Sequence, residues 1–289
     1  MSKIFPWVGG KFHMKNIILR YFPPHKIYVE AFGGSAALLF SKKPSEVEIY
    51  NDIDSGLVNF FRVLQDKDKF EEFYRLITLT PFSRELYNEY RRNWNKETDD
   101  VKRAWKWYAV ACMSFGGRFG AGFGYGVSSS ARGMAFHTSS YLGRLESLPK
   151  FHERIMRVII EHDDFRKILD RYDTPDTLFY LDPPYVLEVR RGKTYDHELD
   201  SSDHKELVDK IMKLKGMTIL SGYNNSIYTR LEENGWKRID TQKTCHVVGR
   251  TRATGLIGEG KVLEQQKRIE SIWLSPNTLK AINIFEGCS

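Results

Sequence analysis

The sequence contains only three cysteines among 289 residues, Cys112, Cys245 and Cys288. They are odd in number, widely spaced and without a C-x-x-C pair, so we expect neither a disulfide framework nor a metal site. No run of about 18 apolar residues occurs, so no transmembrane helix is expected. The amino terminus lacks a long apolar segment, so we expect no secretory signal and a cytoplasmic location.

Acidic residues are fewer than basic ones, 37 against 44, which gives a formal net charge of +7. This modest surplus fits a partner with a phosphate backbone, and it fits an ordinary solvated surface equally well. The hydrophobic fraction of 41% excludes a disordered chain. Aromatic residues are abundant, with 18 Phe, 15 Tyr and 6 Trp, so some rings can serve as stacking surfaces besides filling the core.

The beginning of the chain has the pattern of a parallel α/β sheet. A helix is expected over residues 14–21, and an apolar strand over 26–32 runs into Gly33-Gly34. A second helix is expected to begin at Ala36, and a second strand over 47–50 follows it. The order strand, glycine turn, helix, strand predicts the opening of an open α/β domain.

The middle of the chain has a different residue pattern. The stretch from about Leu57 to Met113 is mostly helical in pattern and rich in large aromatic and charged residues. The stretch from Phe115 to Gly133 is dense in glycine, so it cannot be a regular helix and predicts loops and a hairpin. We therefore predict an inserted domain over residues 58–145, with residues 1–57 and 146–289 forming one α/β domain.

The α/β pattern resumes after the insertion. Apolar runs predict four further strands, at 158–162, 178–181, 217–221 and about 269–274. A helix is expected over 203–213, with Ser201 or Ser202 as its N-cap.

The most informative motif is Asp182-Pro183-Pro184-Tyr185, directly after the strand expected at 178–181. Ligands bind at the carboxyl ends of strands in open α/β sheets. Two consecutive prolines hold a rigid extended turn, so a carboxylate, a fixed carbonyl and an aromatic face converge. Such a group can accept two hydrogen bonds from a planar amino group while stacking on its ring. The alternative is a plain turn with a capping Asp182 and a packed Tyr185, for which this tetrapeptide is an uncommon pattern.

Three other segments are weaker signals when taken alone. Gly33 and Gly34 let a ligand approach the backbone, or simply allow tight packing of a strand on a helix. Asp52 lies where an acidic residue contacts ribose hydroxyls in nucleotide-binding units, although a helix N-cap is the more ordinary role. Trp7 and Lys11 place an aromatic ring and a cation around a flexible turn, which is one way to build a binding site. The alternative is an ordinary core tryptophan and an ordinary surface lysine.

Together these motifs resemble, in order and over nearly the whole chain, the Dam-type (α-group) DNA adenine-N6 methyltransferases of bacteria and phages. The catalytic motif of that family matches residues 182–185 without departure. The other matching segments are Trp7 to Lys11 (W-x-G-G-K), Tyr28 to Ser35 (E-P-F-x-G-x-G), Asn51 to Asp54 (N-D-x-N), Asp164-Phe165, and Asp196 to Glu198 with Ser202 to His204. Ala31 replaces the usual proline and Ser35 lies in the usual glycine region, so the detail of that loop departs from the family.

The resemblance implies a Rossmann-like S-adenosylmethionine-dependent methyltransferase domain with an inserted, mainly helical target-recognition domain that carries a Gly-rich hairpin. The implied catalytic residues are Asp182, Pro183, Pro184 and Tyr185. The implied cofactor-binding residues are Trp7, Lys11, Phe32, Gly33, Gly34, Asp52, Asp164, Phe165 and Asp182.

The implied reaction is methyl transfer to N6 of adenine in a specific duplex DNA sequence. The Asp182 carboxylate and the Pro183 carbonyl would accept the two N6 protons, while the flipped base stacks on Tyr185. Asp52 would bind the cofactor ribose, and Trp7 and Lys11 would close over its methionine end, where Lys11 would pair with the carboxylate. No metal and no covalent enzyme intermediate are required.

Double-stranded DNA is the implied partner of the insertion. Arg118 and Arg132 flank its Gly-rich stretch, and arginine can bridge O6 and N7 of guanine. Arg190, Arg191 and Lys193 follow the catalytic motif and are candidates for phosphate contacts. Each of these cations, taken singly, is as readily an ordinary surface charge. The expected state is a monomer or a weak dimer without membrane contact, and such enzymes include restriction–modification and phage-borne members.

Two other classes of function stay open at this point. A methyltransferase acting on RNA adenine or on a protein amide would use the same amino-group chemistry. The protein-modifying enzymes usually carry N-P-P-Y, and they lack the inserted helical region. A catalytically silent DNA-binding protein is the third reading, and the intact motif at 182–185 argues against it.

Overall fold

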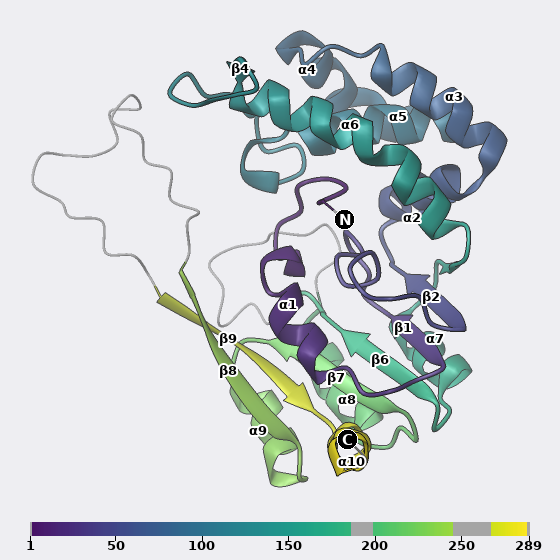
Figure 1. Ribbon diagram of the computed structural model, residues 1–289, viewed down its shortest axis with the longest axis vertical. Helices are drawn as coiled ribbons and strands as arrows, with labels where there is room; N and C mark the ends of the chain where they lie inside the picture. The colour runs from purple at the N-terminus through teal and green to yellow at the C-terminus, as the bar shows by residue number, and fades with distance from the viewer. Residues whose placement is uncertain (1, 186–198, 245–266, 288–289) are drawn as a thin grey trace, which may run out of the picture.

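The computed structural model describes residues 2–185, 199–244 and 267–287. A mostly parallel sheet and its helices occupy one end of the molecule, and a layer of helices occupies the other (Figure 1). The amino-terminal segment passes between the two.

Among the described residues, seven strands form one sheet in the order β5-β2-β1-β6-β7-β9-β8. The first five in that order are parallel, whereas β9 is antiparallel to both β7 and β8. The strands are β1 Ile27–Glu30, β2 Val47–Asn51, β5 Ile159–Glu161, β6 Thr177–Leu181, β7 Met217–Gly222, β8 Lys237–Thr244 and β9 Lys267–Leu274. The predicted α/β class with a mostly parallel sheet is thereby confirmed, whereas β8 was not predicted.

The centre of the sheet explains where a ligand can bind. From β1 the chain adds β2 and β5 on one side, and it then returns to add β6 and β7 on the other. Such a reversal leaves a crevice outside the carboxyl ends of the strands, since the connections diverge there. All five residues of β6 are buried, because a central parallel strand is covered on both faces.

Short helices flank the sheet. They are η1 Lys11–His13, α1 Lys15–Ile18, η2 Leu19–Tyr21, α7 Phe165–Tyr172, α8 Ser201–Ile211, α9 Ser226–Glu233 and α10 Pro276–Gly287. Helix α8 begins two residues before the predicted start, and the prediction of Ser201 or Ser202 as its cap is wrong. Asp200 is the N-cap, because its carboxylate accepts from the Asp203 amide while the Asp203 side chain accepts from the Asp200 amide.

The helix expected from Ala36 to Phe40 does not form. The chain makes turns there, with positive φ at Gly34 (49°) and at Ala36 (52°). A left-handed residue interrupts a right-handed helix. The Leu39 amide donates instead to the buried Glu30 carboxylate at 2.7 Å. A side chain of β1 thus holds the turn that follows it.

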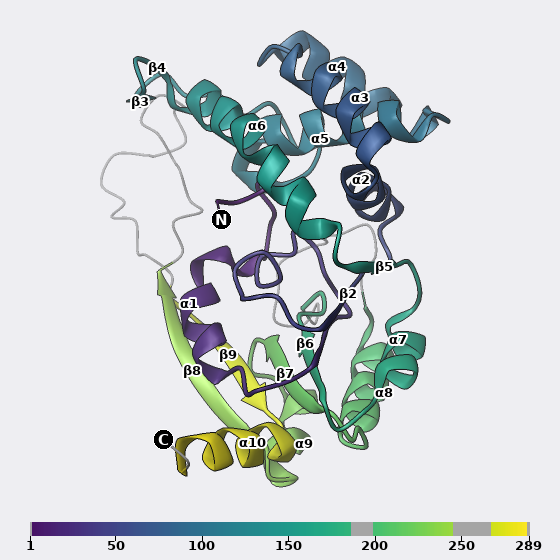
Figure 2. The same cartoon turned by 45° about the vertical axis from the view of Figure 1, so that its right-hand side comes forward.

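The helical layer follows β2 and precedes β5 (Figure 2). Its members are α2 Ser55–Gln65, α3 Lys67–Thr78, α4 Arg84–Asn93, η3 Trp94–Lys96, α5 Asp100–Met113, η4 Phe115–Gly117 and α6 Phe136–Ile155. A two-strand ladder of β3 Ser130–Ala131 and β4 Met134–Ala135 turns at Arg132 and Gly133. Helix α6 is continuous through residue 145, so the layer extends beyond the boundary placed there. The division into domains stays a prediction.

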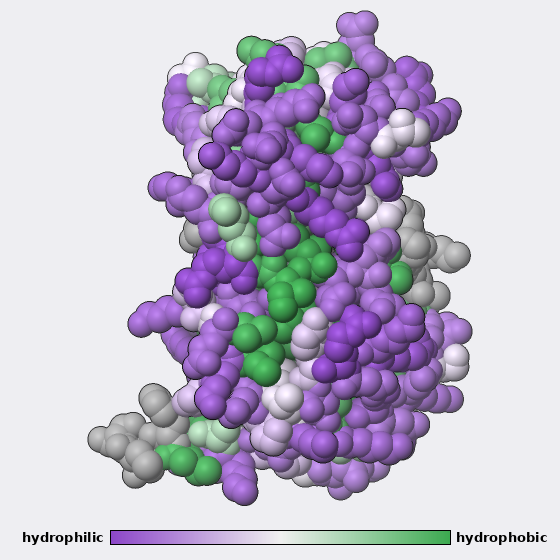
Figure 3. Space-filling model, turned by 90° about the vertical axis from the view of Figure 1, so that its right-hand side faces the viewer, coloured by the Kyte–Doolittle hydropathy of each residue, from purple (hydrophilic) through white to green (hydrophobic). Residues whose placement is uncertain are grey.

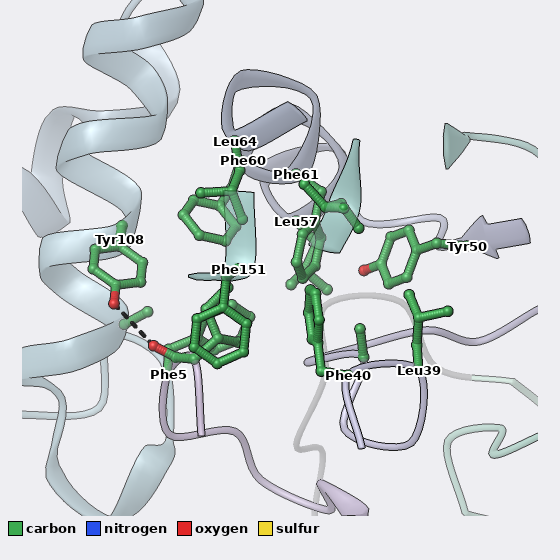
Figure 4. Packing of buried hydrophobic residues seen from close by; sticks show 14 of the residues in the cluster. Phe5, Leu39, Phe40, Tyr50, Leu57, Phe60, Phe61, Leu64, Tyr108 and Phe151 are labelled. Atoms are coloured by element: carbon green, nitrogen blue, oxygen red, sulfur yellow. Dashed lines mark hydrogen bonds between the residues drawn. The ribbon is translucent and has the colours of Figure 1, made fainter. Parts of the chain in front are cut away.

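The two ends of the molecule share one hydrophobic core. Phe61 of α2 lies 4.6 Å from Tyr50 of β2 between ring centroids, and Phe5 of the amino-terminal segment lies 5.6 Å from Phe60 (Figure 4). The Tyr108 hydroxyl donates to the Ile4 carbonyl at 2.9 Å. This packing fixes the helical layer against the sheet, because both sides bury large rings in the same cluster.

A space-filling view shows hydrophobic side chains gathered midway along the molecule, between polar surfaces on either side (Figure 3). Among the described residues, no helix combines the length and the apolar character needed to cross a membrane.

Candidate active site

A cavity of about 440 Å³ lies at the carboxyl ends of β1, β2, β5 and β6. Its volume is in the range of sites for nucleotide-sized ligands. Every residue predicted to bind the cofactor lines it: Trp7, Lys11, Phe32, Gly33, Gly34, Asp52, Asp164, Phe165 and Asp182. Pro184 of the catalytic motif lines it too. These residues come from four strand ends and the amino-terminal segment, so the parallel sheet is what gathers them.

Part of the cavity wall comes from the helical layer, which sequence reasoning missed. Leu57, Trp94, Trp107 and Phe119 line it. The rings of Trp107 and Phe119 stack at 5.5 Å, with an interplanar angle of 23°. The abundance of aromatic residues had indicated that some rings serve as stacking surfaces, but nothing in their spacing marks which rings face a cavity.

The glycine turn after β1 is constrained by the residues that pack around it. A Cβ on Gly33 would lie 2.1 Å from Tyr50 Cε2, so a side chain there meets a buried ring. The Gly33 amide donates to the Asn51 carbonyl at 2.8 Å. Gly34 has a φ of +49°, a conformation that L side chains rarely adopt, and its amide donates to Asp52 Oδ2 at 2.8 Å.

Asp52 joins two loops at the edge of the cavity. Its other oxygen, Oδ1, accepts from the Asp54 amide at 2.9 Å. The alternative reading of Asp52 as a helix N-cap is wrong, because Asp54 caps α2 by accepting from the Gly56 and Leu57 amides. Burial raises the pKa of Asp52 to about 6, against the backbone hydrogen bonds that favour its charged form.

Asp164 and Phe165 lie at the start of α7, on the β5 side of the cavity. Asp164 is the N-cap of that helix and pairs with Arg166 at 3.0 Å. The Phe165 ring lies 5.2 Å from the ring of Phe32, so two aromatic faces flank this side. A planar heterocycle fits against such faces.

Lys11 lies at the opposite end of the cavity and is only 3% exposed. Its ammonium nitrogen donates to Asp182 Oδ1 at 2.6 Å and Oδ2 at 2.7 Å, and to the Tyr185 hydroxyl at 2.8 Å. Lys11 thus pairs with the catalytic motif, a contact that the sequence did not predict. Its pairing with a cofactor carboxylate stays a prediction. Burial opposes this charge, but the carboxylates of Asp182 and Glu270 outweigh it, so the pKa of Lys11 lies well above its ordinary value.

Two further carboxylates at the site were not predicted. The side chain of Glu270 on β9 is 2% exposed, and its Oε1 accepts from the Tyr185 hydroxyl at 2.5 Å. Glu30, at the end of β1, accepts from the Tyr28 hydroxyl and from the Leu39 amide, both at 2.7 Å. Burial raises the pKa of Glu30 to about 7. In both cases the sequence offered one signal, an acidic residue inside an apolar strand. Such a residue indicates a buried acid with a specific partner, because an unpaired buried acid is costly.

The candidate DNA-contacting residues differ in whether their side chains are exposed, paired within the chain or outside the described residues. Arg118 is exposed on the Gly-rich loop, next to Phe119, whose ring packs into the cavity wall. Arg132 is bound within the chain, since its Nη1 pairs with both Glu146 oxygens at 3.0 Å and its Nε donates to Ser139. Arg190, Arg191 and Lys193 lie outside the described residues.

Asp182, two prolines and Tyr185 thus stand at the end of a central parallel strand, beside a nucleotide-sized cavity. Residues 7–250 match the model of the D12 class N6 adenine-specific DNA methyltransferases, and the chain belongs to that family. The family confirms the class predicted from the motifs, and it favours adenine in DNA over RNA adenine or a protein amide.

The chain is similar to individual members from phage and bacteria. It is 29% identical over 217 residues to a DNA N-6-adenine-methyltransferase of Escherichia phage P1. The matched region is 71% of this chain and 27% of the phage protein. It is 23% identical over 271 residues to a DNA adenine methylase of Vibrio cholerae, covering 89% and 92% of the two chains. With the DNA adenine methylase of Haemophilus influenzae it shares 26% identity over 255 residues, or 82% and 85%.

Proposed function

We propose that this chain transfers a methyl group from S-adenosylmethionine to N6 of an adenine in a specific sequence of duplex DNA, after that adenine leaves the helix. The observation that carries the proposal is that Lys11 binds both Asp182, which lines a cavity at four strand ends, and Tyr185, which follows Asp182 in the motif.

The cavity suits the proposed cofactor in the chemistry of its walls. Asp52 offers a carboxylate for ribose hydroxyls, and the rings of Phe32 and Phe165 offer faces for an adenine ring. Gly33 and Gly34 line the cavity beside these groups. When bound, the cofactor supplies a methyl group made electrophilic by its sulfonium sulfur.

The residues at the Asp182 end would act on the target base. Adenine N6 is a weak nucleophile, because its lone pair is delocalised into the ring. The Asp182 carboxylate and the Pro183 carbonyl would each accept one N6 proton, which favours a lone pair directed at the methyl group. Tyr185 would stack on the base and offset the cost of flipping, a few kcal/mol. The catalysis needs position and charge more than a strong base.

The inserted helices and the Gly-rich loop are the proposed target-recognition region. Arg118 is the candidate base reader, because its side chain is exposed while Phe119 holds the loop against Trp107. Arg132 is better placed as a structural residue that ties the turn between β3 and β4 to α6, since Glu146 and Ser139 of that helix engage its guanidinium.

The test offers the chain labelled S-adenosylmethionine and three acceptors: unmethylated bacterial genomic DNA, RNA and a protein extract. We expect label in DNA alone, and digestion to nucleosides should recover it as N6-methyladenine. Label in RNA or protein would overturn the proposal. Mapping the modified adenines then gives the recognition sequence.

A further inference from the structure

Glu270 is a buried acid in an unusual place. It lies on β9 opposite Thr241 of β8, and its side chain is 2% exposed although that of the preceding Ile269 is 52% exposed. A buried carboxylate is costly unless charged or hydrogen-bonding partners compensate it. The partners here are both groups of the candidate active site, Tyr185 and Lys11.

A chain of hydrogen bonds links the three side chains. Lys11 Nζ donates to the Tyr185 hydroxyl oxygen at 2.8 Å, and that hydroxyl donates to Glu270 Oε1 at 2.5 Å. The hydroxyl therefore accepts one bond and donates another, which restricts the tilt of the ring. Tyr223 packs on the same ring at 4.4 Å between centroids. Glu270 thus anchors the far end of the ring on which a flipped adenine would stack.

Glu270 also gives Lys11 a second counter-ion. The ammonium nitrogen lies 2.6 Å from Asp182 Oδ1 and 3.1 Å from Glu270 Oε1. An amino group that bound Asp182 would compete with Lys11 for the acceptor sites of the two carboxylate oxygens. Lys11 Nζ also donates to the Gly9 carbonyl at 3.0 Å, and Glu270 would keep a negative charge within 3.1 Å of it during that competition.

We propose that Glu270 is a positioning residue for methyl transfer: it orients the Tyr185 ring, and it keeps Lys11 paired when the adenine amino group occupies Asp182. This inference rests on the proposed function. It adds a residue from the antiparallel strand β9 to a site built otherwise from the parallel strands and the amino-terminal segment.

The test compares Glu270→Gln, which keeps the size and loses the charge, with Glu270→Asp, which keeps the charge and shortens the reach. Turnover is measured on unmethylated bacterial genomic DNA with labelled S-adenosylmethionine. For Glu270→Gln we expect kcat to fall by about 10- to 100-fold with KM for DNA and for the cofactor within about threefold. Glu270→Asp should lie between this variant and the wild type. Turnover of Glu270→Gln within twofold of the wild type would overturn the proposal.

A matched control separates positioning from stability. Glu48 is another buried carboxylate that, like Glu270, does not line the cavity, but it pairs with Lys42 and Arg154 instead of with Lys11 and Tyr185. Glu48→Gln should lower the melting temperature without lowering kcat of the folded fraction. If Glu270→Gln loses turnover only in proportion to its folded fraction, Glu270 is merely structural and the proposal fails.

A double-mutant cycle with Tyr185→Phe tests the contact itself and needs no substrate. The two changes remove the same hydrogen bond, so their effects on the denaturation midpoint should be less than additive. Additive effects would overturn the contact. The cycle can be measured even if the wild type does not methylate DNA. Failure of the wild type to methylate DNA would refute the proposed function, whereas additive effects in the cycle would refute only the contact.

Discussion

Lys11 and Asp182 are separated by 171 residues in the chain, yet the ammonium nitrogen of one lies 2.6 Å from a carboxylate oxygen of the other. This ion pair fastens the amino-terminal segment to the end of β6. It also neutralises the carboxylate to which an incoming amino group would bind. An amino group that bound at Asp182 would therefore compete with a charge already present.

Replacement of Asp182 by Ala should lower the rate of methyl transfer at least about 100-fold. The loss removes the acceptor for an N6 proton, and effects of about 100- to 1,000-fold are typical when such a group is removed. Single-turnover transfer of labelled methyl to DNA measures it. Asp182→Asn keeps one acceptor oxygen and should retain more activity than Ala. Near-normal turnover of the Ala variant would remove Asp182 from the catalytic role.

Cofactor affinity should weaken below about pH 6. The pKa of Asp52 is raised to about 6, so the carboxylate loses its charge, and with it a strong acceptor for ribose hydroxyls, as the pH falls through that value. The dissociation constant should rise by up to about tenfold per pH unit below 6 and stay level above it. Titration calorimetry from pH 5 to 8 measures this. Asp52→Asn should bind weakly without this pH dependence, and an identical profile in that variant would return Asp52 to a structural role.

Stability should fall as the pH rises from about 4.5 to 7, through Glu30. The pKa of Glu30 is raised from an ordinary 4.5 to about 7, so in this window the folded state holds a proton that the unfolded state has released. The free energy of unfolding then declines by at most about 1.4 kcal/mol per pH unit from this group. Denaturant unfolding at pH 5 and pH 7 measures the difference. Glu30→Gln should show a smaller difference, and an unchanged one would contradict the assignment.

Substitution of Gly33 by Ala should disrupt the turn after β1. The added Cβ would lie 2.1 Å from Tyr50 Cε2, so a buried ring has to move. We expect a loss of a few kcal/mol in the free energy of unfolding, together with weaker cofactor binding. Gly143→Ala is the control: its Cβ would meet nothing closer than 3.9 Å inside α6, and it should stabilise the chain by about 0.5–1 kcal/mol. Equal effects of the two changes would refute this reading.

Arg118→Ala should relax sequence preference if Arg118 reads a base. The expected cost is about 1–3 kcal/mol on the preferred site, with little change on other sequences. If Arg118 contacts phosphate only, binding should weaken evenly, with a shallower salt dependence. Methylation rates on single-base site variants at two salt concentrations distinguish the two. Arg132→Ala is the comparison, because Glu146 already engages that guanidinium, and it should act on stability more than on preference.

The parallel strands and most site residues could be predicted because their signals are local. An apolar run such as 178–181 marks a central strand, and the motif that follows it stands at the carboxyl edge by the geometry of the sheet. The helix expected at Ala36 could not be corrected from sequence. Its failure depends on positive φ angles and on a hydrogen bond from Leu39 to Glu30, which lies nine residues away.

Long-range partners were the other gap. Nothing in the spacing of residues 7–11 shows that the Lys11 ammonium meets Asp182, and a salt bridge of that span is set only by the packed fold. Glu270 lies on a strand whose alternation was predicted, but alternation does not say which partner compensates a buried acid. Phe119 likewise belongs to a Gly-rich stretch, and the stacking that brings it to the cavity is tertiary.

The helical layer leaves the sheet after β2 and returns to it at β5, and these two strands are hydrogen-bonded neighbours. Its two ends therefore emerge side by side, which is the arrangement in which a segment can be exchanged between chains without altering strand order. If the layer reads DNA as proposed, exchanging it for that of another member should change which sequence is modified. The graft would have to reproduce Leu57, Trp94, Trp107 and Phe119, because the exchanged piece is also one wall of the chamber it serves.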